Sequence, residues 1–347
     1  MRPAEQLKGM TLCDGWTVEE AAARKPNATG GHFSTGYLVR AKDGRRGFLK
    51  ALDYTRAFDA VDTAEMLHSM TRAYLFEKEL CEKCAHLSKV ARAIGSGAIT
   101  PENAGKFGKV EYLIFELADQ DIRSHLDAQD TLDLIFVLKT LHNVATGLSQ
   151  LHQAQIAHQD LKPSNVLVYG GGGIAKICDL GRAWDRNVPS PHDSCAIAGD
   201  RGYAPIESLY GEIPVDQLTR RFGVDLYHLG SLIVFLFTRI NANAWLIESL
   251  PPNHRPFVWG GTYAEILPTL QSAFSVLLEG VGGEMHESVR CHLLLAISKL
   301  CDPDPKRRGH PAQTGAGRFS LQQYVSLFDR LAYKAQIALY AANVHTC

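Results

Sequence analysis

The feature that most constrains this chain is a short polar segment, residues 158–165, which reads His-Gln-Asp-Leu-Lys-Pro-Ser-Asn. It brings a carboxylate (Asp160), a cation (Lys162) and an amide (Asn165) into one loop. A second carboxylate, Asp179, opens an Asp-Leu-Gly sequence after two short apolar runs. These residue types are the ones that general-base chemistry and hard metal ions require. The alternative is an ordinary polar loop at a helix–strand junction.

The pattern around this segment predicts a mainly helical region. Apolar residues recur at spacings of three and four from Leu134 to Leu148, which is typical of an amphipathic helix. Two short strands are expected at residues 166–168 and 175–177, with the turn at glycines 170–173. More helices follow, and the last is expected from about Ser320 to Ala342. We expect this last helix to pack on the helical lobe, with a dimer contact as the alternative.

The first third of the chain predicts strands and one helix. Residues 37–39 and 48–52 read as strands joined by a turn at Asp43-Gly44, and residues 110–117 read as a further strand. Residues 63–87 have a helical pattern. The predicted class is therefore α+β, with a small β-rich lobe (1–117) containing one key helix and a large α-helical lobe (118–347). The crevice between two such lobes is an expected ligand site.

Composition excludes some classes of function. The 347 residues include 36 Lys and Arg against 37 Asp and Glu, so no net charge favours nucleic acid or an anionic membrane. The apolar run from Leu229 to Phe237 is too short to span a bilayer and predicts a core helix. The start of the chain lacks the pattern of a signal peptide, and eight scattered cysteines favour a reducing, cytoplasmic setting. We expect Cys81 and Cys84 to be buried apolar side chains rather than metal or redox ligands.

Residues 158–165 and 179–181 resemble two motifs of the eukaryotic-like protein kinases, the catalytic loop in an H-Q-D form and the metal-binding motif with Leu180 for Phe. A chance match to the five specified loop residues is on the order of one in ten thousand for a chain of this length. The resemblance implies that Asp160 is the base and that Lys162 neutralises the transferred phosphoryl group. It also implies Asn165 and Asp179 as Mg²⁺ ligands, whereas His158 has a structural role. A lysine two positions after the aspartate is similar to serine/threonine kinases.

Lys50 resembles the strand lysine that the family uses to bind the α- and β-phosphates of ATP. Its helix partner is either Glu77 or Glu79. Positions three and four residues from Glu77 are apolar, whereas Glu79 shares its face with charged residues, so we expect Glu77. The resemblance also implies a nucleotide site, with Phe115 as the gatekeeper and with backbone groups of the following hinge binding adenine. Its expected members are Gly31, Phe33, Gly36, Phe48, Lys50, Phe115, Glu116, Ala118 and Leu167.

The resemblance extends from about residue 14 to 332. Residues 204–207 resemble the end of the activation segment, so Glu207 is expected to pair with Arg308 in a structural ion pair. Asp225 resembles the residue that anchors the catalytic loop. The glycine-rich loop is degraded, because only Gly31 and Phe33 match its pattern.

Three further residues depart from the family. Gly36 stands where a valine covers adenine and Phe48 where an alanine is usual, which leads to the hypothesis that the two together conserve volume. Gln159 replaces the arginine that receives a loop phosphate in many regulated kinases, which predicts activity without loop phosphorylation. Asp200 replaces a threonine, and its charge is expected to reach Lys162 and to raise one carboxyl pKa.

The resemblance implies a serine/threonine protein kinase that transfers the γ-phosphoryl group of Mg-ATP to a protein hydroxyl. Its expected partners are therefore ATP, Mg²⁺ and a protein substrate. Two alternatives stay open. One is a pseudokinase that acts as a nucleotide-binding or scaffold module, and the other is a kinase-fold enzyme that acts on a small molecule.

Overall fold

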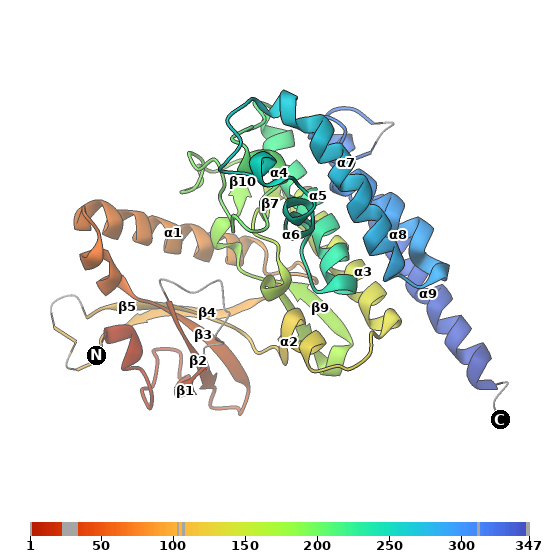
Figure 1. The fold of residues 1–347 in the computed structure, drawn as a ribbon. Helices are drawn as coiled ribbons and strands as arrows, with labels where there is room; N and C mark the ends of the chain where they lie inside the picture. Colours follow the sequence, from red (N-terminus) through yellow and green to blue (C-terminus); the bar gives the residue numbers. More distant parts are fainter. Residues whose placement is uncertain (1, 23–33, 103, 106–107, 311–312, 345–347) are drawn as a thin grey trace. The chain divides into compact units, whose positions relative to one another are not determined.

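The computed structural model describes residues 2–22, 34–102, 104–105, 108–310 and 313–344. The chain divides into two compact units, Met1–Asp119 and Gln120–Cys347. The expected boundary after residue 117 lies two residues before this division. The first unit is rich in strands and the second in helices (Figure 1), which agrees with the predicted α+β class.

The first unit is built on a five-stranded antiparallel sheet with the order β1-β2-β3-β5-β4. The structure confirms the expected strands as β2, β3 and β5 and adds two that the sequence reading missed, β1 and β4. Two glycines interrupt the apolar pattern of β4, and Gly97 is needed there because an added Cβ would lie 2.5 Å from the Tyr112 hydroxyl. The strands are β1 (Thr17–Ala21), β2 (Ser34–Arg40), β3 (Arg46–Leu52), β4 (Ala93–Ile99) and β5 (Val110–Glu116).

Alternation along β3 gives the two faces of this sheet different roles. Leu49 and Ala51 are fully buried in a hydrophobic cluster that the N-terminal residues complete, including Leu7 and Trp16. Lys50 therefore points to the opposite face, because successive side chains of a strand alternate. This second face carries the polar chemistry of the unit.

Helix α1 (Thr63–Lys83) supplies the remaining layer of the first unit. Asp62 caps its first turn by accepting a hydrogen bond from the Glu65 amide at 2.9 Å. The helix ends four residues before the expected Leu87, because Cys84 adopts a non-helical cap conformation. Cys81 and Cys84 are both buried, as predicted.

Helices form most of the second unit, around two small sheets with the orders β6-β8-β9 and β10-β7. The predicted strands appear as β8 and β9, and the predicted amphipathic helix appears as α3. The longer helices are α3 (Leu134–Gln153), α5 (Gln217–Thr238), α7 (Tyr263–Gly283), α8 (Glu287–Leu300) and α9 (Gln322–Val344). The shorter ones are α2 (Ile122–Asp127), α4 (Ile206–Leu209) and α6 (Ala242–Glu248). The strands are β6 (Gln120–Asp121), β7 (Ile156–Ala157), β8 (Val166–Tyr169), β9 (Ile174–Ile177) and β10 (Trp184–Asp185).

Helix α5 is the centre of this unit. By length and composition it could cross a membrane, but 89% of its most apolar window is buried inside the protein, which makes it a core helix. Helix α9 packs against α3 (Figure 1), as expected, and buries Phe328 and Leu331. It starts and ends two residues later than predicted. Beyond this contact Ile337 is 51% and Tyr340 72% exposed.

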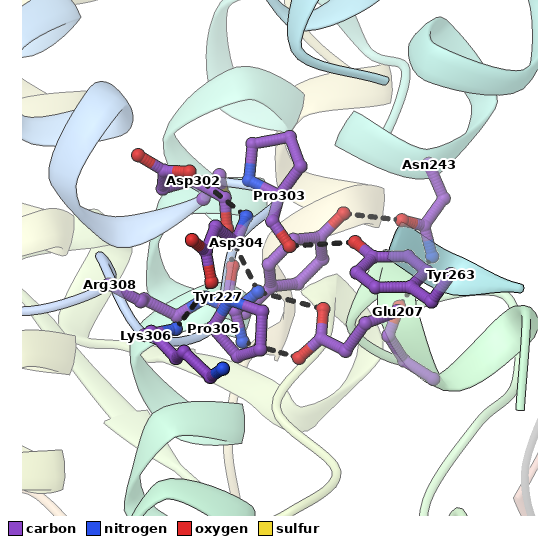
Figure 2. Close-up of polar contacts among 12 residues, drawn as sticks. Glu207, Tyr227, Asn243, Tyr263, Asp302, Pro303, Asp304, Pro305, Lys306 and Arg308 are labelled. Carbon is purple, nitrogen blue, oxygen red and sulfur yellow. Dashed lines mark hydrogen bonds and ion pairs between the residues drawn. The ribbon is translucent and has the colours of Figure 1, made fainter. Parts of the chain in front are cut away.

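A buried ion pair connects α4 to the segment after α8. Figure 2 shows the two guanidinium nitrogens of Arg308 reaching both carboxylate oxygens of Glu207, each at 2.8 Å. The Arg308 guanidinium also stacks over the Tyr227 ring, and one nitrogen donates to the Asp302 carbonyl. The expected Glu207–Arg308 pair is therefore confirmed, and both side chains are almost completely buried. Its bidentate geometry offsets the cost of removing two charges from water.

Removing one member of this pair should be far more damaging than removing a nearby surface charge. We expect Glu207→Gln to lower the free energy of unfolding by about 3–5 kcal/mol, because Arg308 would keep an uncompensated buried charge. The matched control is Arg307→Ala, since the Arg307 side chain is 64% exposed and contacts Asp302 at 3.3 Å. It should cost less than about 1 kcal/mol in urea unfolding. Equal losses for the two variants would contradict this assignment.

Candidate active site

One carboxylate of helix α5 anchors the polar loop of residues 158–165. Asp225 is fully buried and accepts hydrogen bonds from the backbone amides of His158 and Gln159, both at 2.8 Å. His152 on α3 adds a third contact at 2.8 Å. Burial alone raises the pKa of Asp225, but the hydrogen bond and charge of His152 lead the opposing effects and leave the pKa below its usual value. The loop is thus anchored by a charged side chain.

His158 has the architectural place that the resemblance implied. Its ring is fully buried, and Nε2 lies 2.9 Å from the Cys178 carbonyl oxygen, directly before Asp179. Its Nδ1 accepts a hydrogen bond from the Asp160 amide at 3.2 Å. One imidazole therefore connects the two segments that carry the candidate catalytic and metal-binding carboxylates.

The Asp160 carboxylate lies in a dense set of polar contacts. It accepts a hydrogen bond from the Asp200 amide at 2.7 Å and one from the Asn165 side-chain nitrogen at 3.0 Å. Lys162 Nζ lies 3.3 Å from Asp160 and 3.1 Å from the Asp200 carboxylate. Gly199 permits this approach, because an added Cβ would lie 2.7 Å from the Asp160 carboxylate. The structure thus brings three of the singled-out polar residues, Lys162, Asn165 and Asp200, together around the Asp160 carboxylate.

Burial is the first cause that raises the pKa of Asp160, and the charge of Asp179 acts in the same direction. Lys162 and the Asp200 amide lower it. A raised carboxyl pKa is therefore found at Asp160, with burial as its first cause, and the backbone N–H of Asp200 acts on it in the opposite direction. Burial alone lowers the pKa of Lys162, whereas the charges of Asp160 and Asp200 outweigh this and raise it.

The oxygen atoms around this loop suit a hard divalent cation. Asn165 uses its side-chain nitrogen twice, on the Asp160 carbonyl and carboxylate, which directs its side-chain oxygen away from them. Asp179 has a left-handed backbone with φ of 66° at the end of β9. Its charge raises the pKa of Asp160, so the two carboxylates repel each other, and a cation would relieve that repulsion. Mg²⁺ prefers such oxygen ligands.

The first unit holds an ion pair between its sheet and helix α1. Lys50 Nζ lies 2.7 and 3.0 Å from the two carboxylate oxygens of Glu77 on α1. Glu77 is 7% exposed, whereas Glu79 faces solvent, so the structure makes the choice that the helical face predicted. The carboxylate holds the lysine in one position on the sheet.

Strand pairing places four expected nucleotide-site residues on the same sheet face. Gly36 pairs with Lys50, and Phe48 pairs with Phe115 in the next strand. The Phe48 ring fills the space beside Gly36, because an added Cβ at Gly36 would lie 2.8 Å from its tip. The hypothesis of complementary volumes thus has a direct steric basis.

The other expected nucleotide-site residues are distributed over both units. Glu116 ends β5 and accepts a hydrogen bond from the Arg92 amide at 2.9 Å, and Ala118 follows it. Leu167 lies half-buried on β8, opposite Lys176. Gly31 and Phe33 lie outside the described residues.

Comparison with known proteins identifies the family. The family model described as "Protein kinase domain" matches residues 31–244, which is more than half of the chain. This chain belongs to the protein kinase domain family. The kinase motifs of residues 158–165 and 179–181 fall inside the matched region.

Individual kinases resemble the chain over shorter stretches. Mouse "Cyclin-dependent kinase-like 2" is 32% identical over 213 residues, which cover 56% of this chain and 35% of that protein. Rice "Serine/threonine-protein kinase/endoribonuclease IRE1" is 29% identical over 52% of this chain and 17% of its own length. "Cell division control protein 2 homolog 3" of Trypanosoma brucei brucei is 28% identical over 46% of this chain and 58% of its own. The chain thus spans about a third or less of the length of the first two.

The sequence did not point to an arginine that contacts Gln159. Arg221 on α5 is 3% exposed and donates to the Gln159 side-chain oxygen at 2.8 Å. Its other terminal nitrogen reaches the Asp193 carbonyl at 3.0 Å and the Asp193 carboxylate at 3.2 Å. Gln159 also donates to the Arg182 carbonyl at 3.0 Å. A buried arginine early in an apolar helix was the available signal, but only folding brings it to the loop.

The fit between Gly36 and Phe48 predicts a strong steric effect in this kinase. We expect Gly36→Val to displace the Phe48 ring and to abolish ATP binding, with a loss of about 1–3 kcal/mol in stability. The double variant Gly36→Val/Phe48→Ala should recover both, because it restores the volume. Gly260→Val is the matched control, since an added Cβ there meets no atom within 4 Å. Calorimetric titration with ATP gives the measurement, and unchanged affinity in Gly36→Val would contradict the fit.

Proposed function

We propose that this protein is a serine/threonine protein kinase that transfers the γ-phosphoryl group of Mg-ATP to a protein hydroxyl. The observation that carries the proposal is the buried Asp160 carboxylate with Lys162 3.3 Å away. Membership of the protein kinase family and similarity to serine/threonine kinases support it. The lysine two positions after the aspartate supports a serine or threonine acceptor.

In this proposal Asp160 orients the attacking hydroxyl group and accepts its proton as the new bond to phosphorus forms. Its raised pKa makes it a stronger base than an exposed aspartate. Lys162 lies beside it as a cation that stabilises the charge of the transferred phosphoryl group. Lys50, fixed by Glu77, binds the α- and β-phosphates. Mg²⁺, when bound by Asn165 and Asp179, neutralises the triphosphate.

A second candidate function follows from the residues of the first unit that are expected to bind nucleotide. The Phe48 ring occupies the space beside Gly36, and the glycine-rich pattern is degraded. These features favour a pseudokinase that binds nucleotide or a partner without catalysis. The presence of Lys50, Glu77, Asp160, Asn165 and Asp179 favours the active enzyme, because a silent fold has no need to keep all of them.

One assay separates the candidates. Purified protein is incubated with labelled ATP, Mg²⁺ and a generic protein substrate, beside Asp179→Asn, which keeps the shape of the side chain and removes its charge. We expect transfer to serine or threonine by the wild type and a loss of at least about 100-fold in the variant. Stabilisation by ATP without transfer would support the pseudokinase, and transfer to small acceptors alone would refute a protein substrate.

The contacts of Gln159 support activity that does not depend on a loop phosphate. The positive charge of Arg221 takes the place beside residue 159 that the family arginine would supply, and Asp193 already offers it a carboxylate. Ser190 is buried and donates to the Ala183 carbonyl, whereas Ser194 is exposed. The segment is thus held by permanent side chains of the chain itself.

Phosphatase-treated enzyme should therefore be active, and Ser194→Ala should keep its kcat. Arg221→Met should lower kcat by about tenfold or more, because it releases Gln159 and Asp193 together. Arg186→Met is the matched control, since Arg186 is exposed and also donates to a glutamine, Gln155, at 3.0 Å. Steady-state kinetics with dephosphorylated protein gives the comparison. An enzyme that stays inactive until its loop is phosphorylated would contradict the prediction.

A further inference from the structure

Two exposed side chains of the second unit lie against each other outside its core. The Arg201 guanidinium carbon lies 5.3 Å from the centre of the Phe257 ring. Phe257 is 76% and its neighbour Val258 65% exposed. Neither exposed side chain belongs to the buried core, so they form a surface that combines a cation with apolar area.

This surface begins at Arg201, which is next in the chain to a residue that contacts the Asp160 carboxylate. Asp200 donates its amide to Asp160 and pairs with Lys162, and Arg201 follows it directly. Consecutive Cα atoms are about 3.8 Å apart. A substrate whose hydroxyl group reaches Asp160 therefore presents its neighbouring residues to Arg201.

The charge of Arg201 has no carboxylate partner within salt-bridge distance among the residues that the structure describes. Stacking on an aromatic ring uses the face of a guanidinium group and leaves its edge N–H groups available. Those edges match a carboxylate in a bidentate manner. The ring thus orients Arg201 as a receptor for an acidic side chain.

The backbone at Phe257 adopts a strained conformation in the turn that presents its ring. Its φ is 71°, a left-handed conformation that bulky residues rarely adopt. Hydrogen bonds from the Val258 and Trp259 amides to the Arg255 carbonyl, at 3.2 and 3.1 Å, close the turn around it. Tyr210 ties the turn to the segment after Glu207 by donating to the His254 carbonyl at 2.7 Å. Such strain persists where surroundings impose it, and it clusters at functional positions.

We infer that Arg201, Phe257 and Val258 form a docking surface for the protein substrate, specific for a segment that carries a carboxylate side chain beside an apolar residue close to the phosphorylated serine or threonine. The inference rests on the proposed function for the identity of the occupant. The occupant is acidic because the cation next to Asp200 has no carboxylate of its own among the described residues. It is partly apolar because the exposed Phe257 ring lies against the cation and the exposed Val258 follows it in the chain.

The test measures peptide binding and phosphoryl transfer separately. Serine peptides with one Leu carry Asp, Asn or Lys at each of the four positions on either side of the acceptor. Their affinity is measured by fluorescence anisotropy, and transfer from Mg-ATP is measured in parallel. We expect the wild type to favour Asp over Asn by about threefold to fivefold at one or two positions. The preference should fade at high salt, because exposed charges are screened.

Variants then assign the preference to Arg201. Arg201→Glu should reverse it, so that Lys peptides bind better than Asp peptides, whereas the wild-type order should persist in Arg330→Glu. Arg330 is also an exposed arginine, lies on α9 and serves as the matched control. Phe257→Ala should weaken binding of Asp and Asn peptides alike by about fivefold. These ratios are compared within each variant, so a general loss of activity does not affect them.

Equal affinity of the wild type for Asp and Asn peptides, or an unchanged order in Arg201→Glu, would overturn the inference. Failure of the proposed function looks different, because transfer would then be absent from every peptide. In that case a preference for Asp in the anisotropy measurement that Arg201→Glu reverses would still support the docking surface.

Discussion

The fully buried carboxylate of Asp225 is the constraint on which the loop of residues 158–165 depends. Burying a charge is costly, and three hydrogen-bond contacts offset that cost here. Two of them hold the backbone of residues 158 and 159, and Gln159 has a positive φ of 61° that an unrestrained glutamine would seldom adopt. The strained turn directs Asp160 and Lys162 toward the activation segment. The central apolar helix thus positions the chemistry through one polar side chain.

In the polar network around Asp160, a few charged groups make many contacts. Lys162 is shared by two carboxylates, and the Asp200 backbone N–H and the Asn165 side-chain amide donate hydrogen bonds to Asp160. Asp200 stands where the family resemblance implies a threonine, and its carboxylate faces Lys162 while its amide faces Asp160. A change of side chain at this position therefore alters the lysine more directly than the base.

In the segment before Glu207, which resembles the activation segment of kinases, Asp193 and Arg201 make different kinds of contact. Toward α5, Asp193 meets the buried Arg221, which gives the segment an internal counterion. Close to Asp160, Arg201 is left to an aromatic ring and solvent. The segment thus has an internal counterion at Asp193 and an exposed cation at Arg201. The two arginines act differently because one is buried and paired while the other is exposed.

The sequence by itself determined the elements that periodicity and local chemistry encode. Regular spacing predicted the helical face that selected Glu77, the burial of Cys81 and the strands β2, β3 and β5. A motif predicted the pairing of Glu207 with Arg308. Strand β4 was missed because two glycines interrupt its apolar pattern, and the need for Gly97 comes from the Tyr112 side chain of the neighbouring strand. The raised pKa of Asp160 was expected, but its main cause, burial, exists only in the folded chain.

Tertiary structure alone decided the contacts between residues that no local pattern links. Arg221 and Gln159 are 62 positions apart, and Arg201 and Phe257 belong to separate loops. Hydrophobic periodicity specifies which face of a helix or strand is buried, but not which distant polar group it meets. Those contacts depend on how helices pack around α5. The contacts of Asp225 with the loop at residues 158 and 159, and those of Arg221 with Gln159 and Asp193, therefore required the fold.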